Sequence, residues 1–262
     1  MKILYCGDIM GLAGRKVISQ ILPAFRADNS IDFVIAQGEN AGNDGKAPSR
    51  YELESLQKNG VDFFSGGNHS FNHGEADGVY ENTDLPVVRP ANVLARNGRG
   101  YQIVEHMGKR ILIASLLGQT VGNQRVEITN PLIKIDEILA KEKANFDVSI
   151  VNFHGDFSSE KRVIGYYLDG RVSAVIGDHW HVPTADAMIL PKGTAHITDV
   201  GMCGSLHSSL GVKTDTIIDR WLSGRPSKNE MSEEMPFQFN AVIIELEANN
   251  KPVSIRQIQK II

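Results

Sequence analysis

The chain has 262 residues, a formal net charge of −4 and a hydrophobic fraction of 42%. This composition lies outside the disordered class and offers no basic surface for nucleic acid, so stable nucleic-acid binding is not expected. Two cysteines are too few for a disulfide framework, and no apolar run approaches the length of a membrane span. The totals predict one cytoplasmic α/β domain over residues 1–262, with no membrane partner.

Five short apolar runs each end in polar side chains that can bind a metal ion. In chain order these side chains are Asp8, Glu39 and Asn40, Asn68 and His69, His154, and His179 and His181. Each run is typical of a strand in a covered sheet. Ligands of α/β proteins collect outside the carboxyl ends of such strands. The repeated pattern therefore predicts that these side chains form one cluster.

Helices and hairpins are predicted between and after these runs. The predicted helices cover 15–26, 131–143, 159–168 and 214–222, with one more between a capping box at Ser49–Glu52 and Gly60. Hairpins are predicted from 101–104 with 110–116, and from 237–246 with 253–258. The sequence predicts a glycine turn at 11–14 and mostly loop over 70–97, with a polar loop at 199–209 and a surface loop at 224–234.

The run 172–176 is β-branched and apolar, and Gly177 follows it. An extended segment 178–181 would direct His179 and His181 to the same side, because side chains two residues apart share a face. That is an arrangement for binding a metal. Taken alone, the pair could equally be two polar loop residues, and the other four runs are what favour the metal site.

The candidate ligands contain no thiolate, whereas a structural zinc site favours cysteine and fills four positions. Seven oxygen and nitrogen ligands are too many for one such ion and enough for two: Asp8, Glu39, Asn40, Asn68, His154, His179 and His181. Glu39 has the oxygens to bridge a pair. Two metal ions about 3.5–4 Å apart can hold a hydroxide and both oxygens of an in-line phosphoryl displacement. Iron, manganese and zinc all accept imidazole with carboxylate, so ligand type does not name the metal.

The motifs that carry these residues resemble those of a known family. They are Gly7-Asp8, Gly38-Glu39-Asn40, Gly67-Asn68-His69, Phe153-His154, Ser159-Glu160-Lys161, His179-x-His181 and 198–202. In this order, across residues 1–212, they resemble the YmdB-like proteins, a bacterial family of calcineurin-like metallophosphoesterases. The resemblance implies an α/β fold of two sheets forming a sandwich flanked by helices, with the site at one sheet edge. It also implies cyclic-nucleotide phosphodiesterase activity with two metal ions, most often iron.

The resemblance further implies a role for each candidate. Asp8, Glu39, Asn40 and His181 would hold one metal, while Glu39, Asn68, His154 and His179 would hold the other. A hydroxide between the metals would attack the phosphorus of a 2′,3′-cyclic nucleotide, and His69 would protonate the departing ribose oxygen. Two alternatives remain open: a phosphomonoesterase or nuclease on the same site, or a metal-binding regulatory protein with little turnover.

Some residues carry a plainer interpretation beside the functional one. Asn40 could be a loop-capping amide, and His69 a polar turn residue. Asp186 and Asp199 could orient ligand imidazoles or simply form turns. We expect His73 to be a solvated loop residue. His106, His196 and His207 are expected to be structural, and Cys6 and Cys203 to be small buried side chains.

The sequence departs from the family pattern at three places beside the candidate ligands. Phe71-Asn72 stands where Trp-Asp is common, Gly155-Asp156 where Ala-Glu is common, and Trp180 where a small polar residue is common. None of these is a presumed ligand, so they bear on substrate preference. The sequence is compatible with a homo-oligomer and does not specify one.

Overall fold

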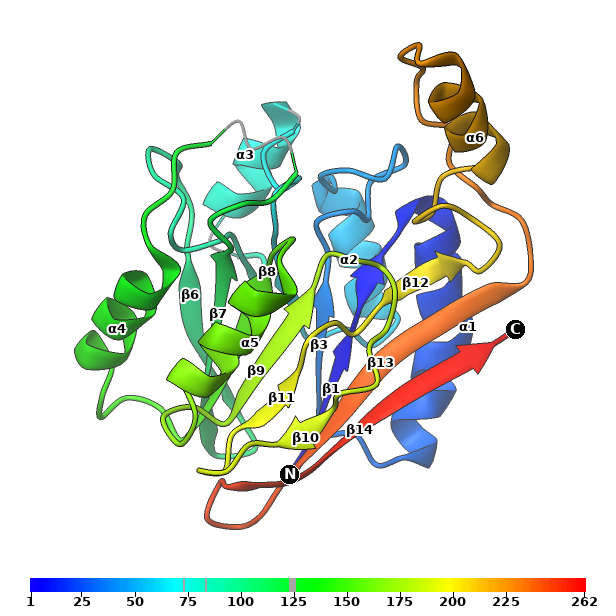
Figure 1. Ribbon diagram of the computed structural model, residues 1–262. Helices are drawn as coiled ribbons and strands as arrows, with labels where there is room; N and C mark the ends of the chain where they lie inside the picture. The colour runs from blue at the N-terminus through cyan, green and yellow to red at the C-terminus, as the bar shows by residue number, and fades with distance from the viewer. Residues whose placement is uncertain (73, 83, 123–125) are drawn as a thin grey trace.

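The computed structural model describes residues 1–72, 74–82, 84–122 and 126–262, with only the backbone for 74–77. Two β-sheets lie face to face, with helices on the outer face of each (Figure 1). In the described residues the helices are α1 (Gly11–Asp28), α2 (Arg50–Lys58), α3 (Gly74–Glu81), α4 (Pro131–Lys141), α5 (Ser158–Tyr167) and α6 (Thr214–Ser223). The two-sheet sandwich implied by the family resemblance is confirmed.

The first sheet has the strand order β2-β12-β13-β1-β3-β4-β5, and β14 pairs with β13. Its strands are β1 (Lys2–Cys6), β2 (Asp8–Ile9), β3 (Phe33–Gln37), β4 (Phe63–Ser65), β5 (Val87–Val88), β12 (Met202–Ser205), β13 (Phe237–Leu246) and β14 (Pro252–Ile261). β1, β3, β4 and β5 run parallel, so their carboxyl ends share one edge.

The second sheet has the order β10-β11-β9-β8-β7-β6. Its strands are β6 (Tyr101–His106), β7 (Lys109–Leu117), β8 (Val148–His154), β9 (Ala174–Asp178), β10 (Met188–Ile189) and β11 (Ala195–Ile197). β7, β8, β9 and β11 are parallel to one another. His154 is the last residue of β8 and Asp178 the last of β9, paired with each other in the register.

Alternation along the strands divides the core into layers. In β1, Ile3 and Tyr5 face the second sheet, whereas Leu4 and Cys6 pack under α1 and α2. This follows from the two-residue period of a strand, which sends neighbouring side chains to opposite faces. The outer face of the second sheet is covered in the same way by α4 and α5. Each sheet is thus buried on both faces, which explains why its strands are continuously apolar.

Several local predictions are confirmed. α2 begins with the predicted capping box, in which Ser49 and Glu52 bond to each other's backbone. Asn130 accepts a hydrogen bond at the start of α4, where Pro131 needs no backbone donor. The two hairpins form as β6 with β7 and β13 with β14. Residues 224–230 are exposed, as expected for a surface loop.

Three local predictions are wrong. Residues 11–14 are the first turn of α1, where Gly14 is required because a Cβ would lie 2.5 Å from the Cys203 carbonyl oxygen. Residues 74–81 form helix α3 within a stretch predicted as mostly loop. The polar segment 199–209 contains the buried strand β12, which pairs with β2 and β13. Tertiary packing overrides local composition in each case.

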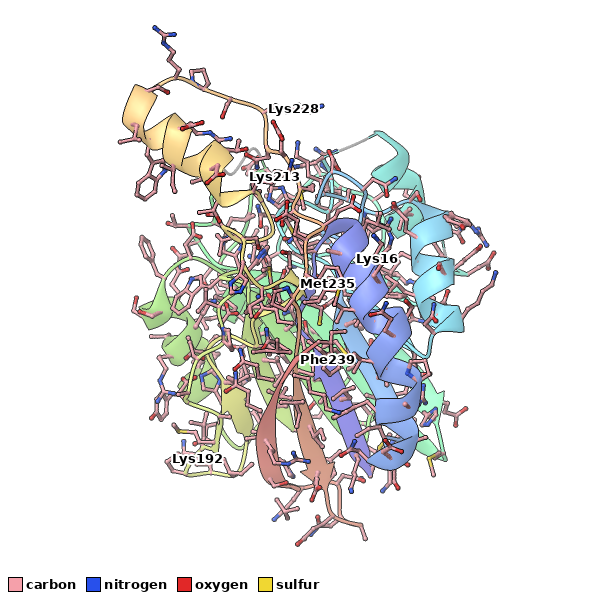
Figure 2. The ribbon with its side chains drawn as sticks, turned by 90° about the vertical axis from the view of Figure 1, so that its right-hand side faces the viewer. Lys16, Lys192, Lys213, Lys228, Met235 and Phe239 are labelled. Atoms are coloured by element: carbon pink, nitrogen blue, oxygen red, sulfur yellow. The ribbon has the colours of Figure 1, made fainter. Side chains whose placement is uncertain are left out.

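Residues 206–234, here called the arm, leave the first sheet after β12 and return at β13. Figure 2 shows Lys213 and Lys228 of the arm at one end of the molecule and Lys192 at the other. The arm carries α6 above the end of the sheets at which β8 and β9 finish (Figure 1). No helix in the described part of the chain is long and apolar enough to cross a membrane.

Candidate metal centre

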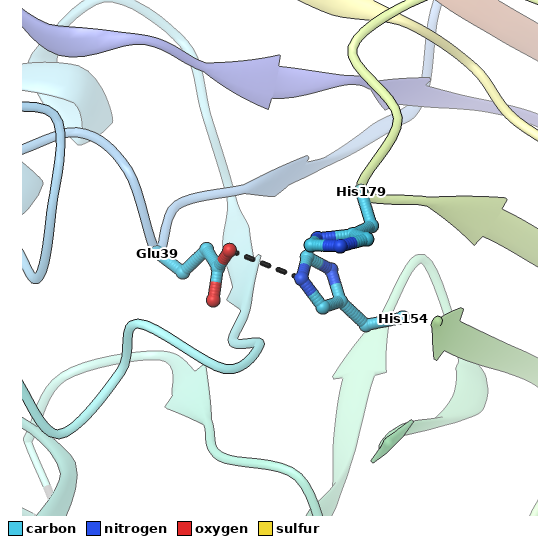
Figure 3. A group of neighbouring side chains, drawn as sticks. All are labelled: Glu39, His154 and His179. Atoms are coloured by element: carbon cyan, nitrogen blue, oxygen red, sulfur yellow. Dashed lines mark ion pairs between the residues drawn. The ribbon is translucent and has the colours of Figure 1, made fainter. Parts of the chain in front are cut away.

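Glu39, His154 and His179 meet where the two sheets end. One ligand atom from each lies within 4.8 Å of the others. Figure 3 shows the Glu39 carboxylate directed at the His154 ring, with the His179 ring against it. The two imidazole centroids are 4.5 Å apart, edge to face. Glu39 comes from the loop after β3, so both sheets contribute to this group.

His154 is buried among oxygen acceptors. Its Nδ1 lies 2.7 Å from Asp178 Oδ1, and its Nε2 lies 2.7 Å from Asn68 Oδ1 and 3.1 Å from Glu39 Oε1. Because ionised carboxylates only accept, both ring nitrogens donate. Burial alone would lower the pKa of His154, but the charges of Glu39 and Asp178 outweigh it and raise that pKa well above its ordinary value. Without a metal, the site therefore holds a proton where a cation would bind.

His179 does not lie on an extended segment. Its φ is +100° and that of His181 is +61°, so the chain turns through the left-handed region on either side of Trp180. The expectation of two imidazoles on one side of an extended strand is wrong. His179 Nε2 instead donates to Asp156 Oδ1 at 2.6 Å, and the His179 backbone amide donates to Asp8 Oδ2 at 3.2 Å. Such backbone strain persists where surrounding contacts hold it, and it is common at functional sites.

The turn sends His181 to a different neighbourhood from His179. His181 Nε2 lies 3.3 Å from Asn40 Nδ2 and 3.8 Å from Asp8 Oδ1. Its Nδ1 donates to the carbonyl of Leu210 on the arm at 3.1 Å. Asn40 Nδ2 also reaches Glu39 Oε1 at 3.2 Å and Asp8 Oδ1 at 3.4 Å. Glu39 thus touches both groups of residues.

Two groups of candidate ligands result, and the following names are used for them. The His154 half consists of Asn68, His154, His179 and Glu39. The His181 half consists of Asp8, Asn40 and His181. The family resemblance implies one metal ion for each group with Glu39 shared, and that assignment stays a prediction.

Asp178 fixes the orientation of the His154 ring through Nδ1, on the side opposite to Asn68 and Glu39. Its Oδ2 accepts from Tyr5 Oη at 2.9 Å, from Gln37 Nε2 at 3.0 Å and from Asn152 Nδ2 at 2.5 Å. All of these side chains are buried, and they come from both sheets. A carboxylate that holds the second nitrogen of a ligand histidine sets its orientation and raises its basicity. In the sequence Asp178 is part of the segment leading to the histidines, and no local pattern singles it out.

Lys161 secures the other side of the same turn. Its Nζ donates to the Asp178 carbonyl and to Asp199 Oδ2, both at 2.6 Å, and lies 4.0 Å from the centroid of the Trp180 ring. Asp199 Oδ2 also accepts from the Trp180 amide at 2.9 Å. This buried pair holds the backbone between the two histidines. Of the two roles considered for Asp199, the structure favours the turn, because its carboxylate binds the Trp180 and Gly201 amides and Lys161 and no imidazole.

The pKa values of the other candidate ligands are shifted by burial and by neighbouring charges. Burial lowers the pKa of His179 and of His181 to about 4, so both imidazoles are neutral near pH 7. Burial, followed by the charge of Asp178, raises the pKa of Asp8 well above its ordinary value. Burial would also raise the pKa of Glu39, but His154 outweighs it and lowers that pKa to about 2. The shifts of Glu39, His179 and His181 thus favour the forms that bind metals, whereas those of Asp8 and His154 favour protonated forms, whose protons a metal would displace.

Three features of the site fit a bound cation. Asn40 Oδ1 is buried and has no hydrogen-bond partner among the described residues. Rotation of the amide would turn this oxygen, in place of Nδ2, towards Asp8, Glu39 and His181, where a cation would give it a partner. A Cβ at Gly67 would lie 2.6 Å from Glu39 Cδ and 2.7 Å from His154 Cε1, so only glycine lets the chain approach the cluster this closely. Asp8 is destabilised by neighbouring negative charge, which a cation would neutralise.

A cleft of about 470 Å³ opens onto this cluster. His69 lines it together with Asn40, Asp156, His179 and His181. The His69 amide donates to Glu39 Oε2 at 2.7 Å, and the His69 Nδ1 lies 2.7 Å from Asn72 Nδ2. The structure therefore places the candidate acid in the cleft next to the candidate ligands, with Nδ1 occupied by Asn72.

Several other residues singled out in the sequence take no part in the cluster, and Asp156 joins it unexpectedly. Asp186 bonds to Thr184, Thr198 and Arg162, so it does not orient a ligand imidazole. Asp156, which the sequence analysis treated only as a departure from the family pattern, takes that role for His179. His106 packs on Phe33, and Cys6 and Cys203 are buried free thiols. His73 lies outside the described residues.

The chain matches known proteins over nearly its whole length. The sequence model of the YmdB-like protein family matches residues 4–258. The chain is 36% identical over 260 residues to the 2′,3′-cyclic-nucleotide 2′-phosphodiesterase of Bacillus subtilis, which covers 98% of this chain and 96% of that protein.

Two crystal structures are closely similar. A hypothetical protein from Thermus thermophilus has a TM-score of 0.91 at 36% identity, covering 100% of this chain and 99% of that one. A phosphatase from Mycoplasma pneumoniae has a TM-score of 0.92 at 32% identity, covering 100% and 93%. The resemblance inferred from the strand-end motifs is confirmed, and the chain belongs to the YmdB-like protein family.

Proposed function

We propose that this chain is a dinuclear metal-dependent phosphodiesterase that hydrolyses 2′,3′-cyclic nucleotides. The observation that carries the proposal is the meeting of Glu39, His154 and His179 beside the His181 half, at the base of a cleft. The name of the Bacillus subtilis relative supports the substrate class. The metal is proposed to be iron, with manganese and zinc as alternatives that the same ligands accept.

The two halves are proposed to hold one metal ion each, with Glu39 shared. Glu39 is suited to sharing because its Oε1 lies 3.1 Å from His154 Nε2 and 3.2 Å from Asn40 Nδ2. When bound, the pair of ions supplies an activated water and neutralises charge on the phosphate. The amide oxygens of Asn40 and Asn68 ligate without cancelling that positive charge.

Hydrolysis of a 2′,3′-cyclic phosphate adds the oxygen of water to phosphorus and breaks the bond to O2′ of the ribose. The departing alkoxide needs a proton, and His69 is the side chain proposed to donate it. Asn72 can support both forms of His69: its amide nitrogen donates to Nδ1 of the neutral ring, and after rotation its oxygen accepts from Nδ1–H of the protonated ring. Only the protonated ring can act as the acid: it gives its Nε2 proton to O2′ and keeps Nδ1–H, which the rotated Asn72 amide oxygen accepts.

The volume of the cleft supports a class of substrate, and the free thiols support a cellular location. A cleft of about 470 Å³ lies in the range of small-molecule sites, roughly 300–1,000 Å³, so we propose a small phosphoester as the substrate. We also propose a cytoplasmic location, because Cys6 and Cys203 are buried free thiols, as in proteins of reducing compartments.

The test combines metal analysis with turnover. Protein purified without added metal or chelator is expected to contain two metal ions per chain and to hydrolyse 2′,3′-cyclic nucleotides faster than phosphomonoesters or oligonucleotides. His154→Ala and His181→Ala should each deplete a different anomalous-scattering peak. Stoichiometric metal with negligible turnover on every phosphoester would favour a regulatory protein, and loss of one shared peak in both variants would contradict the division into halves.

A further inference from the structure

The cleft continues from the metal-binding residues onto the arm. Its remaining lining includes the apolar side chains of Met10, Leu210, Ile217 and Met231 and the guanidinium of Arg220. This group is here called the arm wall. The mechanism proposed above uses none of these side chains.

The arm wall begins directly beside the His181 half. The Leu210 carbonyl accepts from His181 Nδ1 at 3.1 Å, while the Leu210 side chain is 47% exposed and lines the cleft. A group attached to a phosphate at the metal centre would therefore meet Leu210 as it extends along the cleft.

Backbone bonds and glycine contacts fix the arm wall in place. The Ser232 amide donates to the Gly211 carbonyl and the Lys213 amide to the Glu230 carbonyl, both at 2.8 Å. A Cβ at Gly45 would lie 2.8 Å from both Met10 Cε and Met231 Sδ, so the two methionines pack on bare backbone there. Met10 follows β2, which carries Asp8, so the wall and the metal centre share a support.

Arg220 is also held in one orientation. Its Nε donates to Ser227 Oγ at 3.0 Å, and its Nη2 donates to the Ser227 carbonyl at 2.9 Å and to Asn229 Oδ1 at 2.7 Å. A guanidinium fixed along one edge keeps a planar face for stacking on an aromatic ring. Thioethers such as those of Met10 and Met231 also make favourable contacts with aromatic rings.

Binding of phosphate at a metal pair needs no apolar wall, whereas binding of a nucleobase does. We propose that the arm wall is the nucleobase subsite of this enzyme. The substrate is then a mononucleotide-sized phosphoester whose base lies against Leu210, Met231 and Arg220. This inference rests on the phosphodiesterase function proposed above and adds which part of the chain recognises the non-reacting part of the substrate.

The experiment compares substrates with and without a base. The probes are 2′,3′-cyclic AMP and the 2′,3′-cyclic phosphate of methyl ribofuranoside, which keeps the sugar and phosphate only. Arg220→Ala and Met231→Ala should lower kcat/KM for cyclic AMP by up to about tenfold, mainly through KM, because each removes a side chain that contacts the base. Both variants should leave kcat/KM for the baseless substrate within about twofold of wild type, since a surface change away from its contacts has little effect.

The matched controls are Trp221→Ala and Leu222→Ala. Both residues are on α6 beside Arg220, but they are 83% and 82% exposed and do not line the cleft. They should change neither substrate. Equal losses on both substrates in Arg220→Ala and Met231→Ala, or no loss on either, would overturn the subsite.

A binding measurement separates this inference from the proposed function. Calorimetry with 3′-AMP and with the 3′-phosphate of methyl ribofuranoside should show tighter binding of the nucleotide, with the preference reduced by up to about tenfold in Arg220→Ala. If the wild-type protein hydrolyses neither cyclic phosphate but keeps this preference, the subsite stands and the proposed reaction fails. Equal affinity for both ligands would refute the subsite even if turnover is observed.

Discussion

The two halves of the candidate metal centre are supported in different ways. In the His154 half, each imidazole is held by a carboxylate, Asp178 for His154 and Asp156 for His179. Asp178 is in turn held by side chains from both sheets. In the His181 half, the imidazole is held by one backbone carbonyl of the arm, and the oxygen of Asn40 has no partner among the described residues.

This difference shows that one half is part of the core and the other depends on a surface element. Carboxylates behind ligand histidines strengthen metal binding, and a rigid support lowers the cost of organising the site. We therefore expect the His154 half to bind its metal more tightly, and the His181 half to lose its metal first during chelation. The following predictions test the comparison, from the largest expected effect to the smallest.

Glu39→Gln should remove the residue that both halves share. The amide has one charged oxygen fewer, so the metal pair should loosen and turnover should fall to background. The fold should persist, as judged by circular dichroism, because Glu39 lies in a loop after β3 and not in the apolar core. Two retained metals with a near-normal rate would remove Glu39 from the bridging role.

His69→Ala should affect the chemistry without affecting either half. A positioned acid contributes about 10²–10⁴-fold, and only a poor leaving group needs it. The loss in kcat/KM should therefore be much larger for 2′,3′-cyclic AMP than for bis-p-nitrophenyl phosphate, whose nitrophenolate leaves unprotonated. His207→Ala, an exposed histidine outside the cleft, serves as the control. Loss of a metal in His69→Ala would instead place His69 among the ligands.

Asp178→Asn should weaken the His154 half selectively. Loss of a carboxylate behind a ligand histidine typically costs about 10–100-fold in metal affinity. Chelator competition followed by anomalous scattering should show that the peak beside His154 is lost at lower chelator concentration than in wild type. Asp186→Asn is the matched control, because its carboxylate binds Thr184, Thr198 and Arg162. Equal weakening of both peaks would mean that Asp178 supports the whole centre and not one half.

The smallest expected effect is a change in the pH dependence of stability at His196. This buried histidine serves as a reference for His181 because each bonds one backbone carbonyl. It is buried outside the site, with Nδ1 at 3.1 Å from the Val175 carbonyl, so one carbonyl holds it as one carbonyl holds His181. Burial lowers the pKa of His196, and the nearby charges of Asp186 and Arg162 act in opposite directions. Below about pH 6.5, the ordinary value for histidine, the unfolded chain gains a proton that the folded chain resists. Stability should then fall as pH decreases towards the folded pKa.

The measurement is urea unfolding of metal-free wild type and His196→Gln between pH 7 and pH 5. The variant should show a shallower loss of stability, because the other histidines contribute equally to both proteins. An identical slope in the two proteins would mean that burial does not keep His196 neutral. A buried histidine with a single carbonyl partner would then not predict the protonation state of His181.

The sequence alone was sufficient for the candidate ligands and for much of the fold. Asp8, Glu39, Asn68, His154 and the two later histidines each follow an apolar run, and strand ends of parallel sheets meet at one edge. The capping box at Ser49 and the hairpins are likewise encoded by neighbouring residues. These features depend on interactions a few residues long, which a sequence displays directly.

Only the tertiary structure decided which residues hold the candidate ligands in place and which polar segments become a strand or a turn. Asp178 and Asp156 acquire their roles only because β8 and β9 lie side by side and the loop after β8 faces the turn at Trp180. β12 is a strand because β2 and β13 supply its partners, despite its polar surroundings. The left-handed turn at His179 and His181 is held by Lys161, Asp8 and the arm. All of these contacts join residues far apart in the chain, so local pattern carries no record of them.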